Sequence, residues 1–351
     1  MADRTILVTG GAGFIGSEFV RRAASAGSYV ITLDALTYAG NRSTLAAVES
    51  SDSHLFVHGS ITDRALVNKL LADHRPNAII NFAAESHVDR SIDGPGAFID
   101  TNVNGVFELL EAARAYCKSG APANFRFLQI STDEVYGSIA DGRSDEASPL
   151  APNSPYAASK ASADHLVRAY NRTYGLPAII TRASNNYGPY QFPEKLIPLM
   201  ILNAAAVKPL PVYGDGKQRR EWIHVSDHCV AIETILAHGK PGEIYNVGGG
   251  SDAANIDIVR RLCEVVDEMC PSPTSRASLV TYVADRPAHD QRYALDTSKI
   301  QDELGWQPAI GFEEGIIRTV RWYLENEAWW RQIQDSSYRG ERLGLAVQAT
   351  G

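Results

Sequence analysis

The sequence predicts an α/β fold, namely a Rossmann-type, doubly wound parallel sheet joined to a smaller α+β lobe. Short apolar or β-branched runs alternate with segments of helical periodicity through the first half of the chain, a rhythm typical of βαβ units. A glycine-rich turn lies between the first such run and the first helical segment. Turn signals and shorter elements replace this rhythm in the second half, which indicates a separate, smaller lobe.

The elements of the expected sheet can be assigned in order. We expect its strands at residues 6–9, 29–33, 54–57, 78–82, 125–130 and 178–181. We expect its helices at residues 15–26, 64–73, 101–118 and 155–174. Residues 138–154 are rich in Gly, Pro, Asp and Ser, and we interpret them as one long loop near the carboxyl edge of the sheet.

The smaller lobe begins after about Ser184. Its expected strands are residues 211–213, 244–247 and 279–283, and its expected helices are residues 256–269 and 312–328. We therefore divide the chain into a cofactor domain, residues 1–184, and a substrate domain, residues 185–351, and we allow strands of the second part to return to the first. Residues 331–351 carry little signal and are expected to be loosely ordered.

Composition indicates a globular protein, because hydrophobic residues make up 44% and charged residues 21% of the chain. The net charge of −8 argues against a nucleic-acid partner, although a few local Arg and Lys residues still permit an anionic small ligand. The four cysteines show neither C-x-x-C spacing nor neighbouring histidines, so we expect no metal site. The most apolar later stretch, residues 196–207, is short and contains Pro198, so we expect no membrane span and a cytoplasmic protein.

Three glycines in the segment TGGAGFIG, residues 9–16, predict a dinucleotide site. Gly10, Gly13 and Gly16 have the spacing that permits a tight turn, close approach to a pyrophosphate and close helix–strand contact. Asp34 ends the second expected strand 18 residues after Gly16, where a carboxylate binds the adenosine ribose and repels a 2′-phosphate. The pattern indicates NAD rather than NADP; the alternatives are an ordinary glycine turn and a strand-end cap.

Tyr156 and Lys160 lie four residues apart at the start of an expected helix and therefore share one face. We expect the Lys160 ammonium, with a positive nicotinamide nearby, to lower the pKa of the Tyr156 phenol toward neutral pH. Such a phenol can take a proton from a substrate hydroxyl during oxidation. The same spacing also occurs on structural helices, but downstream of a dinucleotide fold it indicates catalysis.

Asp133 and Glu134 follow Thr132 at the end of the fifth expected strand. Adjacent carboxylates at a strand end repel each other, so they form either a solvated turn or a functional pair. In a functional pair, different surroundings can separate the two pKa values and supply an acid and a base in one site. Elimination of water requires such a pair.

Together these motifs resemble the extended short-chain dehydrogenase/reductase superfamily and, more narrowly, the dTDP-glucose 4,6-dehydratases. The resemblance runs from Thr5 to about Trp306. It is carried by DALTYAGN (34–41), AAESHVDRS (83–91), SNNYGPY (184–190), FPEKLIP (192–198), VYGDG (212–216) and DRPAHD (285–290). It implies dehydration of dTDP-glucose to dTDP-4-keto-6-deoxy-glucose, with bound NAD regenerated in every turnover.

The resemblance also implies which residues bind the ligands. The implied NAD contacts are Phe14, Ile15, Asp34, Thr37, Ile61, Ala84, Thr101, Tyr156, Lys160 and Asn186. The implied nucleotide-sugar contacts are Ser86, Thr132, Asn185, Lys195, Leu196, Tyr213, Arg220, Asn255, Arg286 and His289. Arg220 is the expected partner of the diphosphate, although the neighbouring Arg219 could take its place. His87 and His289 lack metal-ligand spacing, and we interpret both as positioning or hydrogen-bonding residues.

The implied chemistry is an internal redox relay. Tyr156 takes the proton of the C4 hydroxyl while C4 gives hydride to NAD. Thr132 holds this hydroxyl in place. Glu134 removes the C5 hydrogen that the new ketone has acidified, and Asp133 protonates the C6 hydroxyl as water leaves. The hydride then returns to C6.

Two residues depart from the family pattern. Ser60 stands where the family often has Asp beside the adenine, so that contact is in doubt. Ala288 replaces a usual Gly in the substrate loop, and we expect it to narrow or reshape the pocket.

Several alternatives stay open at this point. A nucleotide-sugar 4-epimerase shares Tyr156 and Lys160 but needs no acid–base pair for losing water. A UDP-glucuronate-type decarboxylase or GDP-mannose-type dehydratase usually has Ser in place of Asp133. The nucleotide recognised by this chain could also be UDP or another nucleotide. A non-catalytic NAD or sugar sensor would tolerate loss of the catalytic residues. Helices 101–118 and 155–174 resemble the pair that forms a homodimer interface in this superfamily, or they simply cover the sheet.

Overall fold

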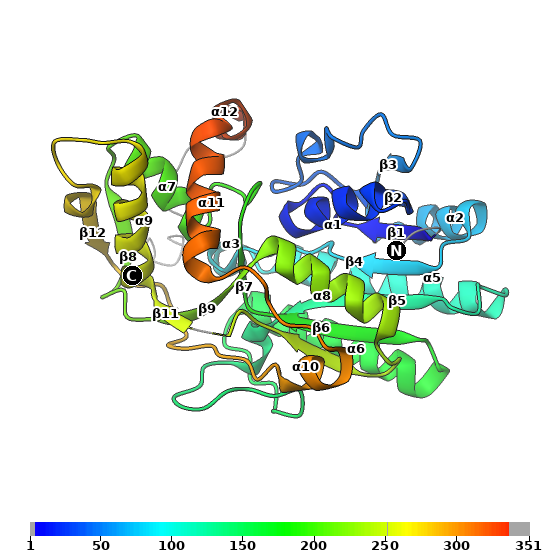
Figure 1. Cartoon of the computed structure of the whole chain (residues 1–351). Helices are drawn as coiled ribbons and strands as arrows, with labels where there is room; N and C mark the ends of the chain where they lie inside the picture. Colours follow the sequence, from blue (N-terminus) through cyan, green and yellow to red (C-terminus); the bar gives the residue numbers. More distant parts are fainter. Residues whose placement is uncertain (1–3, 251, 337–351) are drawn as a thin grey trace.

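A parallel sheet of seven strands forms the larger part of the molecule (Figure 1). The structure is a computed structural model that describes residues 4–250 and 252–336. The strand order is β10-β6-β5-β4-β1-β2-β3, and all neighbouring pairs are parallel. The strands are β1 (Thr5–Thr9), β2 (Tyr29–Asp34), β3 (His54–His58), β4 (Ala78–Asn81), β5 (Arg126–Thr132), β6 (Ala178–Ala183) and β10 (Ile244–Val247). This doubly wound order confirms the expected fold class.

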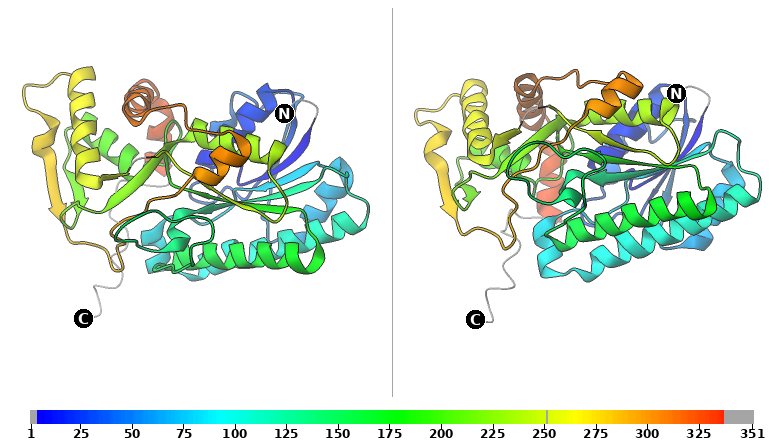
Figure 2. Two further views of the ribbon diagram at one scale, coloured as in Figure 1. Left: turned by 60° about the horizontal axis from the view of Figure 1, so that its bottom comes forward. Right: turned by 90° about the horizontal axis from the view of Figure 1, so that it is seen from below.

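Both faces of this sheet are covered, which explains why its strands read as nearly continuous apolar runs. Successive side chains of a strand point to opposite faces, so Ile6 and Val8 pack in one layer while Leu7 packs in the other. The first layer contains α1 (Phe14–Ser25) and α8 (Val225–His238). The second layer contains α2 (Arg64–His74), α5 (Val106–Lys118) and α6 (Pro155–Tyr174). In the turned views α5 and α6 run side by side along the outer face of the sheet (Figure 2).

The smaller lobe lies beside the carboxyl edge of the sheet and has a hydrophobic core of its own. Its helices are α7 (Leu196–Ala205), α9 (Asn255–Met269), α11 (Phe312–Glu325) and α12 (Glu327–Ser336). A three-stranded sheet contains β7 (Asn185–Tyr187), β9 (Arg219–His224) and β11 (Asp252–Ala254), and a two-stranded sheet contains β8 (Leu210–Tyr213) and β12 (Val280–Val283). The lobe is therefore of the expected mixed α+β type.

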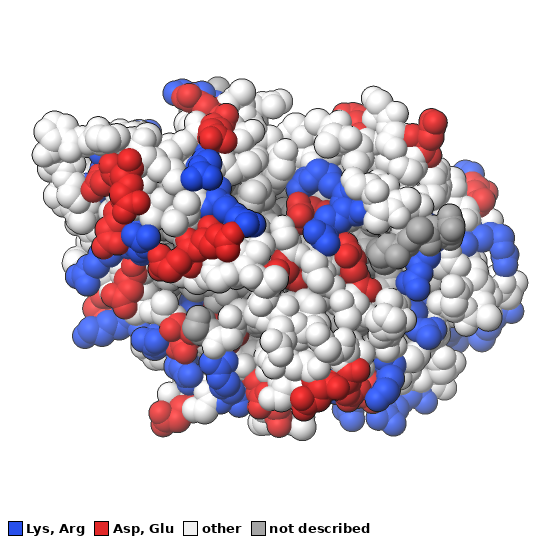
Figure 3. Space-filling model, viewed as in Figure 1, with Lys and Arg blue, Asp and Glu red and all other residues white. Residues whose placement is uncertain are grey.

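Short helical segments fill the connections. They are η1 (Arg42–Leu45), α3 (Val88–Asp93), α4 (Gly96–Phe98), the π-helix η2 (Ile99–Gly105), η3 (Asp133–Tyr136), η4 (Arg276–Leu279) and α10 (Ser298–Leu304). The helix expected at residues 101–118 therefore starts as a π-helix and becomes α-helical at Val106. Figure 3 shows Lys and Arg interspersed with Asp and Glu over one face of the molecule, with no wide area of a single sign there.

The structure differs from the sequence expectations in two places, and it adds one helix that the sequence did not lead us to assign. The strand at residues 244–247 pairs with β6 in the large sheet and does not lie in the smaller lobe. Residues 196–205 form helix α7 in spite of Pro198, because that proline occupies the first turn, where its missing N–H has no partner to lose. Helix α12 continues to Ser336, so residues 331–336 are helical rather than loosely ordered; residues 337–351 lie outside the described part of the chain. None of the described helices reaches the length and hydropathy that a membrane crossing would require.

Candidate active site

A first cavity lies at the carboxyl ends of the central strands, between the glycine-rich turn and α6. Every residue expected to contact the cofactor lines it, except Asn186. These residues are Gly10, Gly13, Phe14, Ile15, Gly16, Asp34, Thr37, Ile61, Ala84, Thr101, Tyr156 and Lys160. Asn186 is engaged elsewhere: its side chain contacts His228 Nδ1 at 2.9 Å and donates to the Ser184 carbonyl.

The glycine-rich turn has the shape that a diphosphate needs. Gly10 adopts a left-handed conformation with φ +68°, and a Cβ atom there would lie 2.5 Å from the backbone nitrogen of Ala83. A Cβ atom on Gly16 would lie 2.3 Å from the Gly10 carbonyl oxygen. Gly13 is the N-cap residue of α1, and in the described structure it gives this helix no side-chain cap. The first N–H groups of the helix are therefore available to an anion. The cavity therefore fits a dinucleotide.

Asp34 is held at the end of β2 by the backbone on both sides. Its Oδ2 accepts a hydrogen bond from Ala12 N and its Oδ1 accepts one from Leu36 N, both at 2.8 Å. Burial raises the pKa of this carboxyl, and the two backbone hydrogen bonds oppose that shift. Each oxygen keeps a second lone pair for a ribose hydroxyl.

We expect Asp34→Asn to raise the dissociation constant for NAD by about tenfold, because one charge-assisted acceptor is lost and an amide N–H group then faces a backbone N–H. Isothermal titration of cofactor-stripped protein measures this constant. Asp63→Asn is the control, since Asp63 caps α2 through Leu66 N and does not line the cofactor cavity. Equal weakening of NAD binding in both variants would contradict the role of Asp34.

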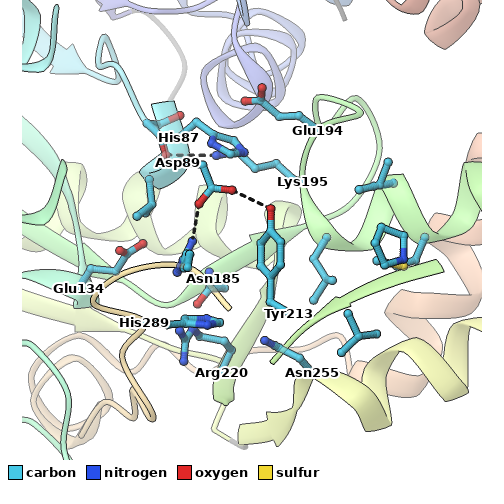
Figure 4. A pocket seen from close by; sticks show the side chains of 18 of the residues that line it. His87, Asp89, Glu134, Asn185, Glu194, Lys195, Tyr213, Arg220, Asn255 and His289 are labelled. Carbon is cyan, nitrogen blue, oxygen red and sulfur yellow. Dashed lines mark hydrogen bonds and ion pairs between the residues drawn. The ribbon is translucent and has the colours of Figure 1, made fainter. Parts of the chain in front are cut away.

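A second cavity lies between the large sheet and the smaller lobe (Figure 4). All the expected nucleotide-sugar residues except Thr132 line it: Ser86, Asn185, Lys195, Leu196, Tyr213, Arg220, Asn255, Arg286 and His289. Ser86, Glu194 and Lys195 line both cavities, so the two spaces adjoin. A ligand in the second cavity can therefore reach one in the first.

Three cations face the second cavity. Arg220 is buried; its Nη2 donates to the Asp290 carbonyl at 2.9 Å and its guanidinium stacks on the Tyr293 ring at 4.4 Å. Arg219, the alternative to Arg220, pairs instead with Asp252 outside the cavity. The Lys195 ammonium donates to the Ser86 carbonyl at 3.1 Å.

Arg286, the third cation, is restrained by a carboxylate. Its Nη1 lies 3.3 Å from Asp89 Oδ1. The hydroxyl of Tyr213 donates to the other oxygen of this carboxylate, Asp89 Oδ2, at 3.0 Å (Figure 4). Asp89 thus positions two of the residues that line the cavity. Guanidinium and ammonium groups that line a cavity are suited to a diphosphate.

The adjacent carboxylates Asp133 and Glu134 lie in η3, directly after β5, and have different surroundings. Asp133 is 2% exposed; its Oδ1 accepts from the Thr132 hydroxyl at 3.2 Å, and its Oδ2 has no hydrogen-bond partner in the described structure. Burial and the charge of Glu134 raise the pKa of Asp133 well above its ordinary value, which favours the protonated form. Thr132 and Asp133 lie behind the cavity surface, whereas Glu134 lines it.

Glu134 has cations around it. Burial raises its pKa, but the charges of Arg286, Arg220 and Lys195 act in the opposite direction and favour the carboxylate. Both pKa values are therefore raised, but that of Asp133 lies well above its ordinary value, whereas three cations oppose the rise in that of Glu134. Such a separation of pKa values is what a paired acid and base require.

The protein's own groups shift the pKa of Tyr156 upward, opposite to the direction expected with a nicotinamide nearby. Burial first, and then the charge of Glu134, raise the pKa of the Tyr156 phenol well above its ordinary value, although a hydrogen bond with Thr132 lowers it. Burial also lowers the pKa of Lys160 to about 8, and its ammonium donates to the Ile130 carbonyl at 2.6 Å. Desolvation is the largest influence on both pKa values.

The sequence reasoning did not single out three residues that the structure brings to the site. Asp89 and Glu194 line the second cavity, and Tyr293 supports Arg220. Asp89 and Glu194 lie within the motifs AAESHVDRS and FPEKLIP, where a charged residue inside a mostly apolar or polar-neutral run was the available signal. Tyr293 carried no local signal. His87 caps α3 through Arg90 N, and His289 Nδ1 lies 2.6 Å from Asp285, so both act as hydrogen-bonding residues in this structure.

The two departures from the family pattern have different surroundings. Ser60 lines the cofactor cavity, and its hydroxyl contacts that of Thr62 at 2.8 Å. Ala288 adopts φ +51°, the left-handed region that favours glycine, but its side chain is exposed and does not line the second cavity. The expectation that Ala288 narrows or reshapes the pocket was therefore wrong: the methyl group strains the loop without entering the cavity.

We expect Ala288→Gly to stabilise the protein slightly, by about 0.5–1 kcal/mol, because the relief of left-handed strain exceeds the added flexibility of the unfolded chain. Urea unfolding measures this change. Because Ala288 does not line the cavity, KM for the nucleotide sugar should stay within about twofold of the parent value. A large fall in KM would show that Ala288 restricts the pocket after all.

Comparison with known proteins agrees with this geometry. The family described as GDP-mannose 4,6 dehydratase matches residues 7–319. The dTDP-glucose 4,6-dehydratase of Xanthomonas campestris pv. campestris (strain B100) is 59% identical over 349 residues, covering 98% of this chain and 99% of the relative.

Two solved structures are similar over nearly their whole length. DesIV, a dTDP-glucose 4,6-dehydratase from Streptomyces venezuelae with NAD and TYD bound, is 50% identical with a TM-score of 0.88, covering 94% of this chain and 99% of that one. The dTDP-glucose 4,6-dehydratase from Bacillus anthracis str. Ames in complex with NAD is 44% identical with a TM-score of 0.84, with coverage of 94% and 99%.

Proposed function

Because this chain belongs to the dTDP-glucose 4,6-dehydratase family, we propose that it converts dTDP-glucose into dTDP-4-keto-6-deoxy-glucose with loss of water. The protein is an NAD-dependent lyase of the short-chain dehydrogenase/reductase fold. The observation that carries the proposal is the pair Asp133 and Glu134. Asp133 is buried and its pKa is raised well above the ordinary value, whereas Glu134 lines the nucleotide-sugar cavity among three cations that oppose the rise in its pKa.

The cofactor would be held by the glycine-rich turn, Asp34 and the residues that line the first cavity. When bound, NAD takes a hydride from C4 of the hexose and later returns it to C6, so that no net oxidation results. The diphosphate would be bound by Arg220, Arg286 and Lys195, whose charges face the adjoining cavity. The sugar then lies between the two cavities, next to Tyr156 and Glu134.

Oxidation at C4 requires a base for the hydroxyl proton. We assign this role to Tyr156, with the Thr132 hydroxyl holding the substrate oxygen and Lys160 supplying positive charge from the next turn of α6. Because burial raises the pKa of Tyr156, we infer that additional positive charge must act on the phenol before it becomes an effective base. The ligands themselves would exclude water and strengthen every such interaction.

Loss of water follows from the ketone at C4, which acidifies the hydrogen at C5. Glu134 lines the cavity as a carboxylate among three cations and would remove this hydrogen. Asp133 would protonate the C6 hydroxyl, so that the C6–O bond breaks and water leaves. We assign that proton to its Oδ2, which has no hydrogen-bond partner among the described residues.

The alternatives share the fold but not this pair. A 4-epimerase needs Tyr156 and Lys160 only, and decarboxylases or GDP-mannose-type dehydratases resemble this chain less at Asp133. The family that matches residues 7–319 is named for a GDP-mannose enzyme, whereas the relative that is 59% identical over 349 residues acts, by its name, on dTDP-glucose. A sensor without catalysis would have no need for an acid and a base with separated pKa values.

We also propose that two copies form a homodimer through α5 and α6. These helices lie side by side on the outer face of the sheet, where Phe107 is 40% and Tyr174 is 52% exposed (Figure 2). Sedimentation velocity of the parent and of Phe107→Glu would test this proposal. We expect the parent to be a dimer and the variant to be a monomer. We place the protein in the cytoplasm, because the described cysteines are free thiols.

Incubation with dTDP-glucose tests the activity directly. We expect a 4-keto-6-deoxy product without net accumulation of NADH, and a much lower rate with UDP-glucose run in parallel. Conversion to a C4 epimer instead would contradict the assignment as a dehydratase. Equal rates on dTDP-glucose and UDP-glucose would contradict the assignment of thymine as the nucleotide base of the substrate.

A further inference from the structure

A buried ion pair lies one helical turn beyond the catalytic lysine. Asp164 follows Lys160 by four residues on α6, so the two side chains share one face of the helix. Arg182, on the neighbouring strand β6, donates through Nε to Asp164 Oδ2 at 2.9 Å. The side chains of Arg182 and Asp164 are only 4% and 1% exposed. Buried ion pairs contribute little net stability, so this one calls for another explanation.

The pair connects the helix to the segment that carries the acid and the base. Arg182 also donates through Nη1 to the hydroxyl of Tyr136 at 2.9 Å, and Tyr136 donates to Asn246 Oδ1 at 2.8 Å. Tyr136 belongs to η3, the same short helix as Asp133 and Glu134. Arg182 therefore holds Asp164 in one place relative to the reacting groups.

Asp164 is the carboxylate whose charge acts on Lys160. Burial lowers the pKa of Lys160 to about 8, and the charge of Asp164 opposes that shift. The Lys160 ammonium also donates to the Ile130 carbonyl on β5, and Lys160 lines the cofactor cavity together with Tyr156, Ser131 and Thr101. The charges of Asp133 and Glu134 act on Tyr156, and Arg182 acts on Asp164.

We propose that Asp164 is a positioning residue of the reaction: it is the buried counter-charge that keeps Lys160 cationic beside Tyr156, and Arg182 keeps Asp164 ionised and in place. This inference rests on the proposed function. Arg182 is needed because burial favours the protonated form of Asp164, whereas the guanidinium favours the carboxylate. A neutral Asp164 could not stabilise the ammonium.

The pair acts from behind the site and not through a ligand. Asp164 and Arg182 line a third cavity, formed with residues 145–150 and the outer turns of α6, and neither lines the cofactor or the nucleotide-sugar cavity. Substitution of either residue therefore leaves both ligand-binding surfaces intact. An effect on the reaction would then pass through Lys160, through the placement of η3, or through Ser131, whose hydrogen bond lowers the pKa of Asp164 and which lines the cofactor cavity.

The sign of the effect follows from the charge. Lys160 is active as the ammonium, so activity is present below its pKa and is lost as pH rises through it. Asp164→Asn should move this alkaline limb of kcat to lower pH by about one unit or more. At a pH above the limb the variant should be roughly tenfold slower than the parent, and the difference should shrink toward lower pH.

The experiment uses the NAD-bound protein in four forms, namely the parent protein and three variants. Asp164→Asn removes the counter-charge, and the double variant Asp164→Asn/Arg182→Met removes both charges, so that no lone charge is left buried if the single variant folds poorly. Asp227→Asn is the matched control, because Asp227 is a buried carboxylate on α8 that accepts from Ala309 N and Ile310 N, away from Lys160. Protein carrying ¹³C at lysine Cε reports the Lys160 titration directly, with the signal assigned by Lys160→Met.

We expect both Asp164 variants to lower the Lys160 titration midpoint and the alkaline limb together, while Asp227→Asn lowers thermal stability without moving either. An unchanged Lys160 midpoint in a folded Asp164 variant would overturn the proposal. If the parent does not dehydrate dTDP-glucose, the proposed function fails, yet the Lys160 titration still decides whether Asp164 is its counter-charge.

Discussion

Replacing Tyr156 with Phe is expected to reduce kcat by about 10²–10⁴-fold, because the group that accepts the C4 hydroxyl proton is lost. The change removes one oxygen and keeps the ring, which is buried and packs edge-on against Phe98 at 6.2 Å. Oxidation at C4 comes first, so dehydration must fall by the same factor. Single-turnover measurement of reduced cofactor, together with product formation, records both steps.

Tyr116→Phe is the matched control for this prediction. Tyr116 is also buried, and its hydroxyl donates to the Pro76 carbonyl at 3.1 Å, outside both ligand cavities. Its loss should lower stability by about 1 kcal/mol and leave kcat unchanged. If Tyr156→Phe oxidised the sugar at the parent rate, another base would have to be found.

Replacing Asp133 with Asn should slow dehydration by about 10²–10⁴-fold and spare C4 oxidation. The amide keeps the size of the carboxyl and its contact with Thr132, but it cannot deliver a proton to the C6 hydroxyl. The enzyme should therefore stop after the first step, and reduced cofactor should build up and persist in a single turnover. Equal loss of both steps would contradict the assignment of Asp133 as the acid.

Glu134→Gln distinguishes the acid from the base. In heavy water, the Asp133 variant should still exchange the C5 hydrogen, because Glu134 remains able to remove it. Sugar recovered from that variant should carry deuterium at C5, and sugar recovered from Glu134→Gln should not. The reverse pattern would exchange the two roles.

Most of the larger domain could be predicted from the sequence, since the six expected strands and four expected helices of the first half all occur close to their expected bounds. Much of the second lobe could not be predicted in this way. The strand β9 and the helix α8 gave no clear periodic signal, and their place depends on packing between the sheet and the smaller lobe. The expected ligand contacts were carried by long motifs, and all but Thr132 and Asn186 line one of the two cavities.

Periodicity, glycine spacing and motif order are local properties of the chain, and they were sufficient for the Rossmann fold, the cofactor cavity and the family. The pairing of Asp89 with Arg286, 197 residues away, and the ion pair of Asp164 with Arg182 arise only where distant elements meet. The same holds for the raised pKa of Tyr156 and the left-handed backbone at Ala288. Desolvation depends on how completely the folded protein encloses a group, and backbone strain depends on how both ends of a loop are anchored, so neither can be read from neighbouring residues alone.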